Sequence, residues 1–143
     1  MKLSSDKKLL SVVVPCYNEE ESLPLFHQAV TQAFAGCGYS YEIIYVDDGS
    51  RDRTMLQLRK LHKAQDCPVK VIRFSRNFGK EAALYAGIKH AEGDYISLID
   101  ADLQQHPDVV VEMLAEIDNI LPNISQECNR QKHPPTAQEP LQR

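Results

Sequence analysis

The chain has 143 residues, 43% of them hydrophobic and 25% charged, which is typical of one globular domain or a fragment of a larger protein. The chain has 16 Lys and Arg residues and 20 Asp and Glu residues, and the basic residues form no block. Nucleic acid is therefore disfavoured as a partner. The four cysteines include no Cys-x-x-Cys pair, which disfavours a local zinc or redox motif and indicates free thiols in a reducing, cytoplasmic environment.

Short apolar segments rich in β-branched residues alternate with segments of helical periodicity. The first apolar run, Leu9–Cys16, is too short to cross a membrane and is interpreted as a buried strand. Strands are expected at residues 11–14, 41–46, 69–74 and 94–99, and helices at about 22–36, 52–61, 80–91 and 107–117. The order βαβαβαβα predicts an α/β fold: an open, mostly parallel sheet with right-handed connections and helices on both faces.

The composition changes near residue 118. All aromatic residues lie at or before Tyr95, whereas residues 118–143 contain four of the eight prolines and only scattered apolar side chains. Such a segment buries too little surface to offset its ordering entropy. We therefore expect a folded domain at 1–117 and a disordered, polar, proline-rich tail at 118–143.

Polar residues follow each expected strand. They occur in Pro15-Cys-Tyr-Asn-Glu-Glu-Glu21, Asp47-Asp-Gly-Ser50, Arg73-Phe-Ser-Arg-Asn-Phe-Gly-Lys80 and Asp100-Ala-Asp-Leu-Gln104. Ligands of open α/β sheets bind beyond the carboxyl ends of the strands, so these turns are the candidates for a site. Alone, Asp47, Asp48, Ser50 and Asp52 could merely cap the second helix.

The pair Asp100 and Asp102 is the most specific signal. In an extended segment, residues two apart project to one side, so both carboxylates could bind one Mg²⁺ or Mn²⁺ ion, with Gln104 as a further oxygen ligand. Such a cation is commonly shared with substrate phosphates. The alternative is that this acidic turn only caps the fourth helix.

Gly79 and Lys80 stand where the third helix should begin. Unpaired N–H groups at a helix start favour anions, and Lys80 would add a positive charge, although Gly79 could merely form a turn beside a solvated lysine. Neither a G-x-G-x-x-G nor a Walker-type motif is present. His106 could approach the Asp pair, and Cys16 is interpreted as a small packing residue.

Together, the four motifs resemble the family 2 glycosyltransferases of GT-A fold. The resemblance covers about residues 9–117 in order and spacing and is strongest for polyprenyl-phosphate enzymes such as bactoprenol glucosyltransferase and dolichol-phosphate mannose synthase. It implies a nucleotide-sugar donor, such as UDP-glucose, and a polyprenyl-phosphate acceptor at the cytoplasmic face of the membrane. It also implies inverting displacement at the anomeric carbon.

The resemblance further implies roles for individual residues. Residues similar to those lining the base and ribose pocket are Pro15, Tyr17 and Glu19. Asp47 resembles the carboxylate that accepts from the base N3–H, with Asp48 beside it. Asp100 resembles the acid near ribose and metal, Asp102 the principal metal ligand, and Lys80 a residue bordering the donor.

The residues after the fourth expected helix match none of the acceptor-side segments of that family. We therefore expect a truncated or out-of-frame product that retains the donor half-site with impaired activity, or a non-catalytic nucleotide-sugar-binding fragment. The fourth strand should then lie at an exposed edge and favour self-association. A phosphoacceptor receiver domain is disfavoured, because the acidic pairs follow strands two and four rather than strand one.

Overall fold

The computed structural model describes the backbone of residues 8–132 and the side chains of residues 8–120. The elements alternate as expected. They are β1 (Leu9–Cys16), α1 (Leu23–Phe34), β2 (Ser40–Asp47), α2 (Thr54–Ala64), β3 (Val69–Arg73), α3 (Lys80–His90), β4 (Tyr95–Leu98) and α4 (Asp108–Lys132).

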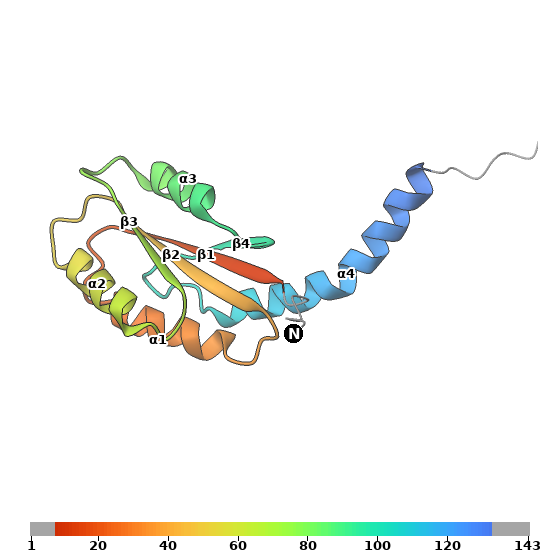
Figure 1. Ribbon diagram of the computed structural model, residues 1–143, viewed down its shortest axis with the longest axis horizontal. Coiled ribbons are helices and arrows are strands. Elements are labelled where there is room, and N and C mark those ends of the chain that lie inside the picture. Colours follow the sequence, from red (N-terminus) through yellow and green to blue (C-terminus); the bar gives the residue numbers. More distant parts are fainter. Residues whose placement is uncertain (1–7, 133–143) are drawn as a thin grey trace, which may run out of the picture. The chain divides into compact units, whose positions relative to one another are not determined.

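The strands form one parallel sheet in the order β3-β2-β1-β4. Figure 1 shows α1 and α2 on one face and α3 on the other, so the predicted α/β architecture with both faces covered is confirmed. The chain runs outward from β1 to β3 and then crosses back to place β4 on the other side of β1. The strand order therefore reverses beside β1.

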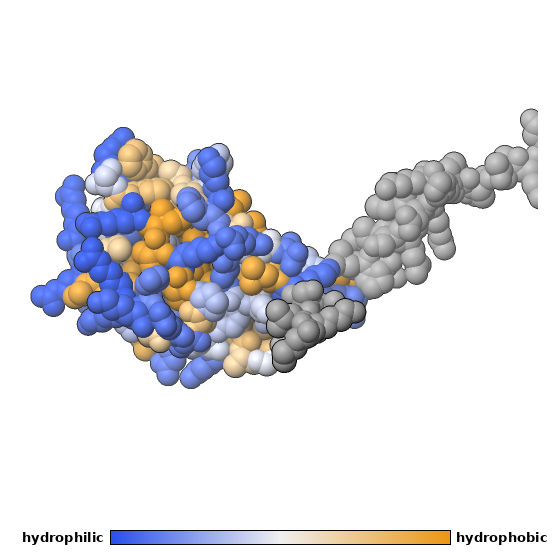
Figure 2. Space-filling model, in the orientation of Figure 1, coloured by the Kyte–Doolittle hydropathy of each residue, from blue (hydrophilic) through white to orange (hydrophobic). Residues whose placement is uncertain are grey.

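The core is centred on β1 and β2. Both strands read as nearly continuous apolar runs, as expected for strands covered on both faces. Leu23, Phe26 and Val30 of α1 are fully buried on one side. On the other side, Gly87 lets α3 approach Val13 so closely that an added Cβ would collide with the valine. Figure 2 shows that hydrophobic surface also gathers over the middle of the sheet, next to α3.

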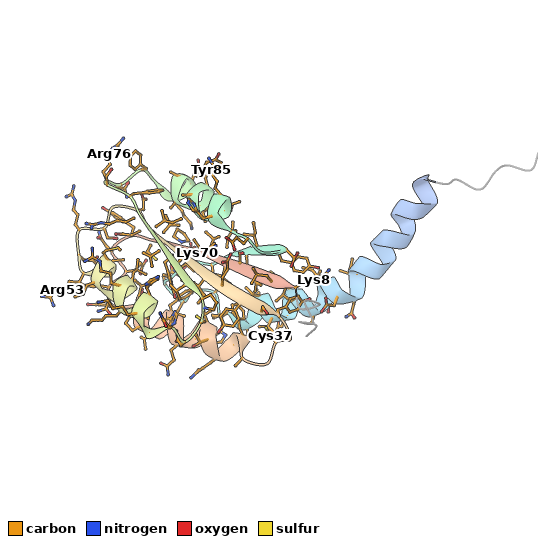
Figure 3. All side chains as sticks on the ribbon, in the orientation of Figure 1. Lys8, Cys37, Arg53, Lys70, Arg76 and Tyr85 are labelled. Carbon is orange, nitrogen blue, oxygen red and sulfur yellow. The ribbon has the colours of Figure 1, made fainter. Side chains whose placement is uncertain are left out.

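A buried carboxylate connects the strands on the α3 side of the sheet. Glu42 of β2 accepts hydrogen bonds from the Ser11 hydroxyl at 2.7 Å and from the Glu92 backbone N–H at 2.9 Å. Its second oxygen pairs with the Lys70 ammonium at 3.0 Å. Lys70 lies on β3 and is labelled in Figure 3. One side chain thus links β1, β2, β3 and the turn before β4.

Two helix starts differ from the simple capping pattern. Ser22 precedes α1 but caps no backbone N–H; its hydroxyl donates to the Glu19 carboxylate at 2.6 Å. At α2, Asp52 accepts from the Thr54 backbone N–H at 2.9 Å, so one acid of the second strand-end turn does serve the helix.

The fourth helix extends beyond the expected boundary near residue 118 and ends at Lys132. Helical spacing of apolar residues, as at Val110, Leu114 and Ile117, continues to Ile120, so the periodicity crosses the change in composition. The contacts divide the chain into two units, Met1–Val111 and Glu112–Arg143. Residues 133–143 of the expected tail lie outside the described part. Within it, no helix is long and apolar enough to cross a membrane.

Candidate functional site

A pocket of about 210 Å³ lies at the carboxyl ends of β1 and β4, where the strand order reverses. Such a switch point is where open α/β sheets bind ligands. The lining residues are Pro15, Cys16, Tyr17, Glu19, Asp48, Lys80, Asp100, Ala101 and Asp102. Seven of the nine residues singled out in the sequence therefore meet at one pocket; Asp47 and Gln104 do not line it.

Hydrogen bonds join the loops that follow β1 and β2. Asn18, which has a positive φ of 53°, donates its backbone N–H to the Ser50 hydroxyl at 2.9 Å. Its side-chain oxygen accepts from the Arg51 N–H at 2.9 Å. The Glu19 N–H donates to the Thr54 hydroxyl at 2.8 Å. Because both loops are held by each other, the β1 side of the pocket is fixed before any ligand arrives.

Asp48 anchors the loop before α3. It is buried, and its carboxylate accepts from the Phe78 N–H at 2.8 Å, the Gly79 N–H at 3.1 Å and the Asn77 amide at 3.2 Å. Asp48 therefore does not cap α2, which was the alternative open from the sequence. It also occupies N–H groups at the start of α3 that were expected to attract an external anion.

Asp47 is directed inward rather than into the pocket. It is 1% exposed, and its carboxylate accepts from the Ser50 N–H at 3.0 Å. Its backbone carbonyl accepts from the Phe74 N–H, which fixes the end of β3. The first acid of the Asp-Asp pair thus shapes its own turn, whereas the second holds the neighbouring loop and reaches the pocket wall.

The acidic pair Asp100 and Asp102 lines the pocket from the turn that follows β4. Asp100 and Asp102 are exposed, whereas Ala101 between them is buried. The Lys80 ammonium contacts the Asp100 carboxylate at 2.8 Å. The Asp102 carboxylate accepts from the Gln104 backbone N–H at 3.1 Å, so Gln104 contributes to the turn through its main chain.

Leu103, between Asp102 and Gln104, has a φ of 61°. A left-handed conformation costs a branched residue about 1–2 kcal/mol. The turn that presents Asp102 therefore stores backbone strain, as ligand-binding turns often do.

Cys16 was not proposed as a site residue, yet it lines the pocket. Cys16 is 1% exposed, and its thiol lies 3.6 Å from the Val14 carbonyl oxygen. Burial, followed by the charges of Asp47 and Glu19, raises its pKa well above the usual value, so it is not an activated nucleophile and the packing interpretation fits. His106 pairs with Asp108 at 3.1 Å and does not line the pocket.

The pocket wall is acidic. Among its lining residues, Glu19, Asp48, Asp100 and Asp102 carry carboxylates, and Lys80 carries the one ammonium. Asp48 is held by two backbone N–H groups and the Asn77 amide, whereas Asp100 and Asp102 are exposed and keep oxygens open to a ligand. Exposed carboxylate oxygens are the ligands that Mg²⁺ and Mn²⁺ prefer, so the donor set fits such a cation.

Comparison with known proteins agrees with this geometry. The model of the family described as glycosyl transferase family 2 matches residues 11–133. The chain belongs to this family. The Bacillus subtilis (strain 168) protein CsbB, whose name places it among glycosyltransferases, is 46% identical over 100 residues, covering 69% of this chain and 30% of CsbB. The chain thus spans about a third of that relative.

Solved structures that contain bound nucleotide-sugars share the fold. S. aureus TarS 1-349 in complex with UDP-GlcNAc has a TM-score of 0.62 and 25% identity, covering 77% of this chain and 31% of TarS 1-349. The mannosyltransferase PcManGT from Pyrobaculum calidifontis, in complex with GDP-Man and Mn²⁺, has a TM-score of 0.59 and 26% identity, covering 75% and 31%. The resemblance to GT-A glycosyltransferases is therefore confirmed.

Proposed function

We propose that this chain forms the donor-binding part of a glycosyltransferase that takes a hexose from a nucleotide-sugar, UDP-glucose being the first candidate. One observation carries the proposal: side chains from three separate segments of the chain line one pocket at the switch point of the sheet. They are Tyr17, Glu19, Lys80, Asp100 and Asp102. The nucleotide-sugars bound to TarS and PcManGT support a donor of this chemical class.

We propose specific roles for the lining residues. The β1 loop, through Pro15, Tyr17 and Glu19, would hold the base and ribose, with Asp47 and Asp48 supporting that side from the end of β2. Asp100 and Asp102, with Gln104 beside them, would hold Mg²⁺ or Mn²⁺. When bound, the cation offsets the negative charge of the donor diphosphate. Lys80, already paired with Asp100 at 2.8 Å, would keep that carboxylate oriented and border the diphosphate.

The proposed reaction is an inverting displacement. An oxygen of a polyprenyl phosphate attacks the anomeric carbon, the bond from that carbon to the diphosphate oxygen breaks, and the nucleoside diphosphate leaves with both bonding electrons. A phosphate monoester is largely ionised at neutral pH, so the acceptor needs placement more than deprotonation. The acceptor would be reached at the cytoplasmic surface of the membrane.

Removal of the Asp102 carboxylate tests the donor site. In Mn²⁺, titration calorimetry of UDP-glucose, UDP and GDP should show binding to the unmodified chain, preferably to the uridine ligands. Asp102→Ala should weaken that binding at least tenfold, because one of the two carboxylate ligands of the cation is lost, and chelation of Mn²⁺ should act similarly on the unmodified chain. Glu112→Ala removes an exposed carboxylate outside the pocket and should leave binding unchanged.

Donor binding that is equally tight without Mn²⁺ and in Asp102→Ala would contradict this assignment. Sugar transfer to polyprenyl phosphate by the chain itself would establish catalysis directly. Nucleotide-sugar binding without transfer would instead support the non-catalytic alternative.

We also propose that the chain self-associates through β4. This strand is at the edge of the sheet, and Ile96 and Leu98 on it are 44% and 46% exposed. Unpaired edge strands with exposed apolar side chains tend to pair with further strands. Light scattering after size exclusion should show oligomers, and Ile96→Lys should shift them toward monomer. A monomer at all concentrations would contradict the proposal.

A further inference from the structure

A second group of metal-ligating side chains lies away from the pocket, between α1 and the turn that joins α2 to β3. It consists of His27, Asp66 and Cys67, and one ligand atom from each lies within 4.8 Å of the others. His27 comes from the middle of α1, whereas Asp66 and Cys67 directly precede β3. The group is therefore assembled by the fold and has no spacing pattern in the sequence.

The imidazole is buried and held at both nitrogens. His27 is 4% exposed; its Nδ1 lies 2.7 Å from the Tyr45 hydroxyl, and its Nε2 lies 3.1 and 3.2 Å from the two Asp66 carboxylate oxygens. Tyr45 is itself fully buried on β2, so it fixes the ring orientation. A metal-binding histidine typically uses one nitrogen while a neighbour holds the other, which is the arrangement here.

The other two side chains open to solvent. The Asp66 side chain is 47% exposed, and Cys67 is half-buried. Both line a surface hollow that His62 also lines. His27 itself does not line the hollow, so an ion entering there would pass Asp66 and Cys67 and replace the contact between Asp66 and the His27 Nε2.

The chemistry of the set fits zinc better than the cations expected at the pocket. One nitrogen, one oxygen and one sulfur are ligands that Zn²⁺ accepts together, whereas Mg²⁺ and Mn²⁺ favour oxygen alone. Ligand atoms on a tetrahedral Zn²⁺ ion are about 3.3–3.8 Å apart, given bonds of about 2.0–2.3 Å. The His27–Asp66 distances of 3.1 and 3.2 Å are already near this value. The Cys67 sulfur, which lies within 4.8 Å of the other two ligand atoms, would approach them to complete three ligands, with a water as the fourth.

A nucleophilic cysteine site is a weaker explanation of the same group. Such a site needs the thiol on one imidazole nitrogen and an orienting group on the other, but Asp66 and Tyr45 contact the two nitrogens. Cys67 also carries no sign of activation, since burial and the Asp66 charge raise its pKa to about 11.

The geometry points to a tetrahedral transition-metal site formed by His27, Asp66 and Cys67, which takes Zn²⁺ and is separate from the pocket at the carboxyl edge of the sheet. Its position is structural: the ion would join α1 to the start of the edge strand β3. Metal binding should therefore raise the thermal stability of the chain independently of any nucleotide.

Titration with Co²⁺, which replaces Zn²⁺ and absorbs visible light, tests this site. The full chain should develop the intense visible bands of tetrahedral Co²⁺ and a near-ultraviolet thiolate-to-metal band, both abolished by excess Zn²⁺. Cys67→Ser should lose the thiolate band, and Asp66→Asn should weaken Co²⁺ binding about tenfold or more. Cys37→Ser alters a cysteine outside the group and should keep both bands, as should Asp102→Asn at the pocket.

Thermal denaturation gives a second measurement. Zn²⁺ should raise the midpoint of the unmodified chain and of Asp102→Asn, but not of Cys67→Ser. A thiolate band that persists in Cys67→Ser, or the absence of tetrahedral bands and of any Zn²⁺-dependent stabilisation in the folded chain, would overturn the proposal and leave His27 and Asp66 as a simple hydrogen-bonded pair.

Discussion

Replacing Glu42 with alanine is expected to lower the free energy of unfolding by about 2–4 kcal/mol, because buried donors lose an ionised acceptor. The Glu42 side chain is 5% exposed. The substitution would remove the carboxylate that accepts from the Ser11 hydroxyl and the Glu92 N–H and pairs with Lys70. Urea denaturation followed by circular dichroism measures the change. Glu92→Ala is the matched control: this second carboxylate on Lys70 is 75% exposed and should contribute at most about 1 kcal/mol.

The same carboxylate should make stability depend on pH. Burial by itself raises the pKa of Glu42, but the hydrogen bonds from Glu92, Ser11 and Lys70 and the Lys70 charge outweigh it, so the net pKa lies below its usual value of 4.5. The unfolded chain then binds a proton at higher pH than the folded chain does. This contribution is present above pH 4.5 and is lost as the pH falls through the lower folded-state pKa. In Glu42→Gln that step should vanish; identical acid profiles would contradict the assignment.

Gly49→Ala is expected to destabilise the chain by about 2–5 kcal/mol, because two separate penalties add. Gly49 has a φ of 69°, which disfavours any side chain with a Cβ. That Cβ would also collide with the backbone of Arg76 and Asn77, in the loop that Asp48 holds. Figure 3 shows Arg53 and Arg76 at this same end of the sheet, where the β2 and β3 loops meet. Chemical denaturation gives the loss of stability.

Gly36→Ala separates the two penalties. Gly36 has a similar φ of 77°, but nothing lies within 4 Å of an added Cβ. This control should lose only the conformational part, about 1–2 kcal/mol. Donor binding should also weaken in Gly49→Ala and not in Gly36→Ala, since only Gly49 adjoins a loop of the pocket. Equal destabilisation by both substitutions would show that the loop after β2 leaves room for a Cβ at Gly49 beside the loop after β3.

Much of the fold follows from local patterns. The β-branched runs beginning at Val12 and Ile43, and the helical spacing of Leu23, Phe26 and Val30, predict the alternation of elements that the structure has. Parallel pairing follows from that alternation, because each crossover helix returns the chain to the same end of the sheet. The order and spacing of the four strand-end motifs likewise predict the family to which the chain belongs.

The end of the last helix could not be read from composition. The loss of aromatic residues and the gain of prolines marked a boundary near residue 118, but α4 continues past it to Lys132. Helix formation depends on backbone hydrogen bonds between nearby residues, which composition alone does not report. The roles within Asp47-Asp48 were also undetermined. Both acids can cap a helix, and only the packing of the β2 and β3 loops decides that Asp48 takes the N–H groups of Phe78 and Gly79.

By itself, then, the sequence determined the order of elements, the parallel sheet and the set of turns that could hold a ligand, because periodicity and turn residues act over short distances. The tertiary structure alone decided which side chains meet: Asp100 with Lys80, Glu42 with Lys70, and His27 with Asp66 and Cys67. These partners come from different elements, and their approach depends on strand order and helix packing, which no local pattern encodes.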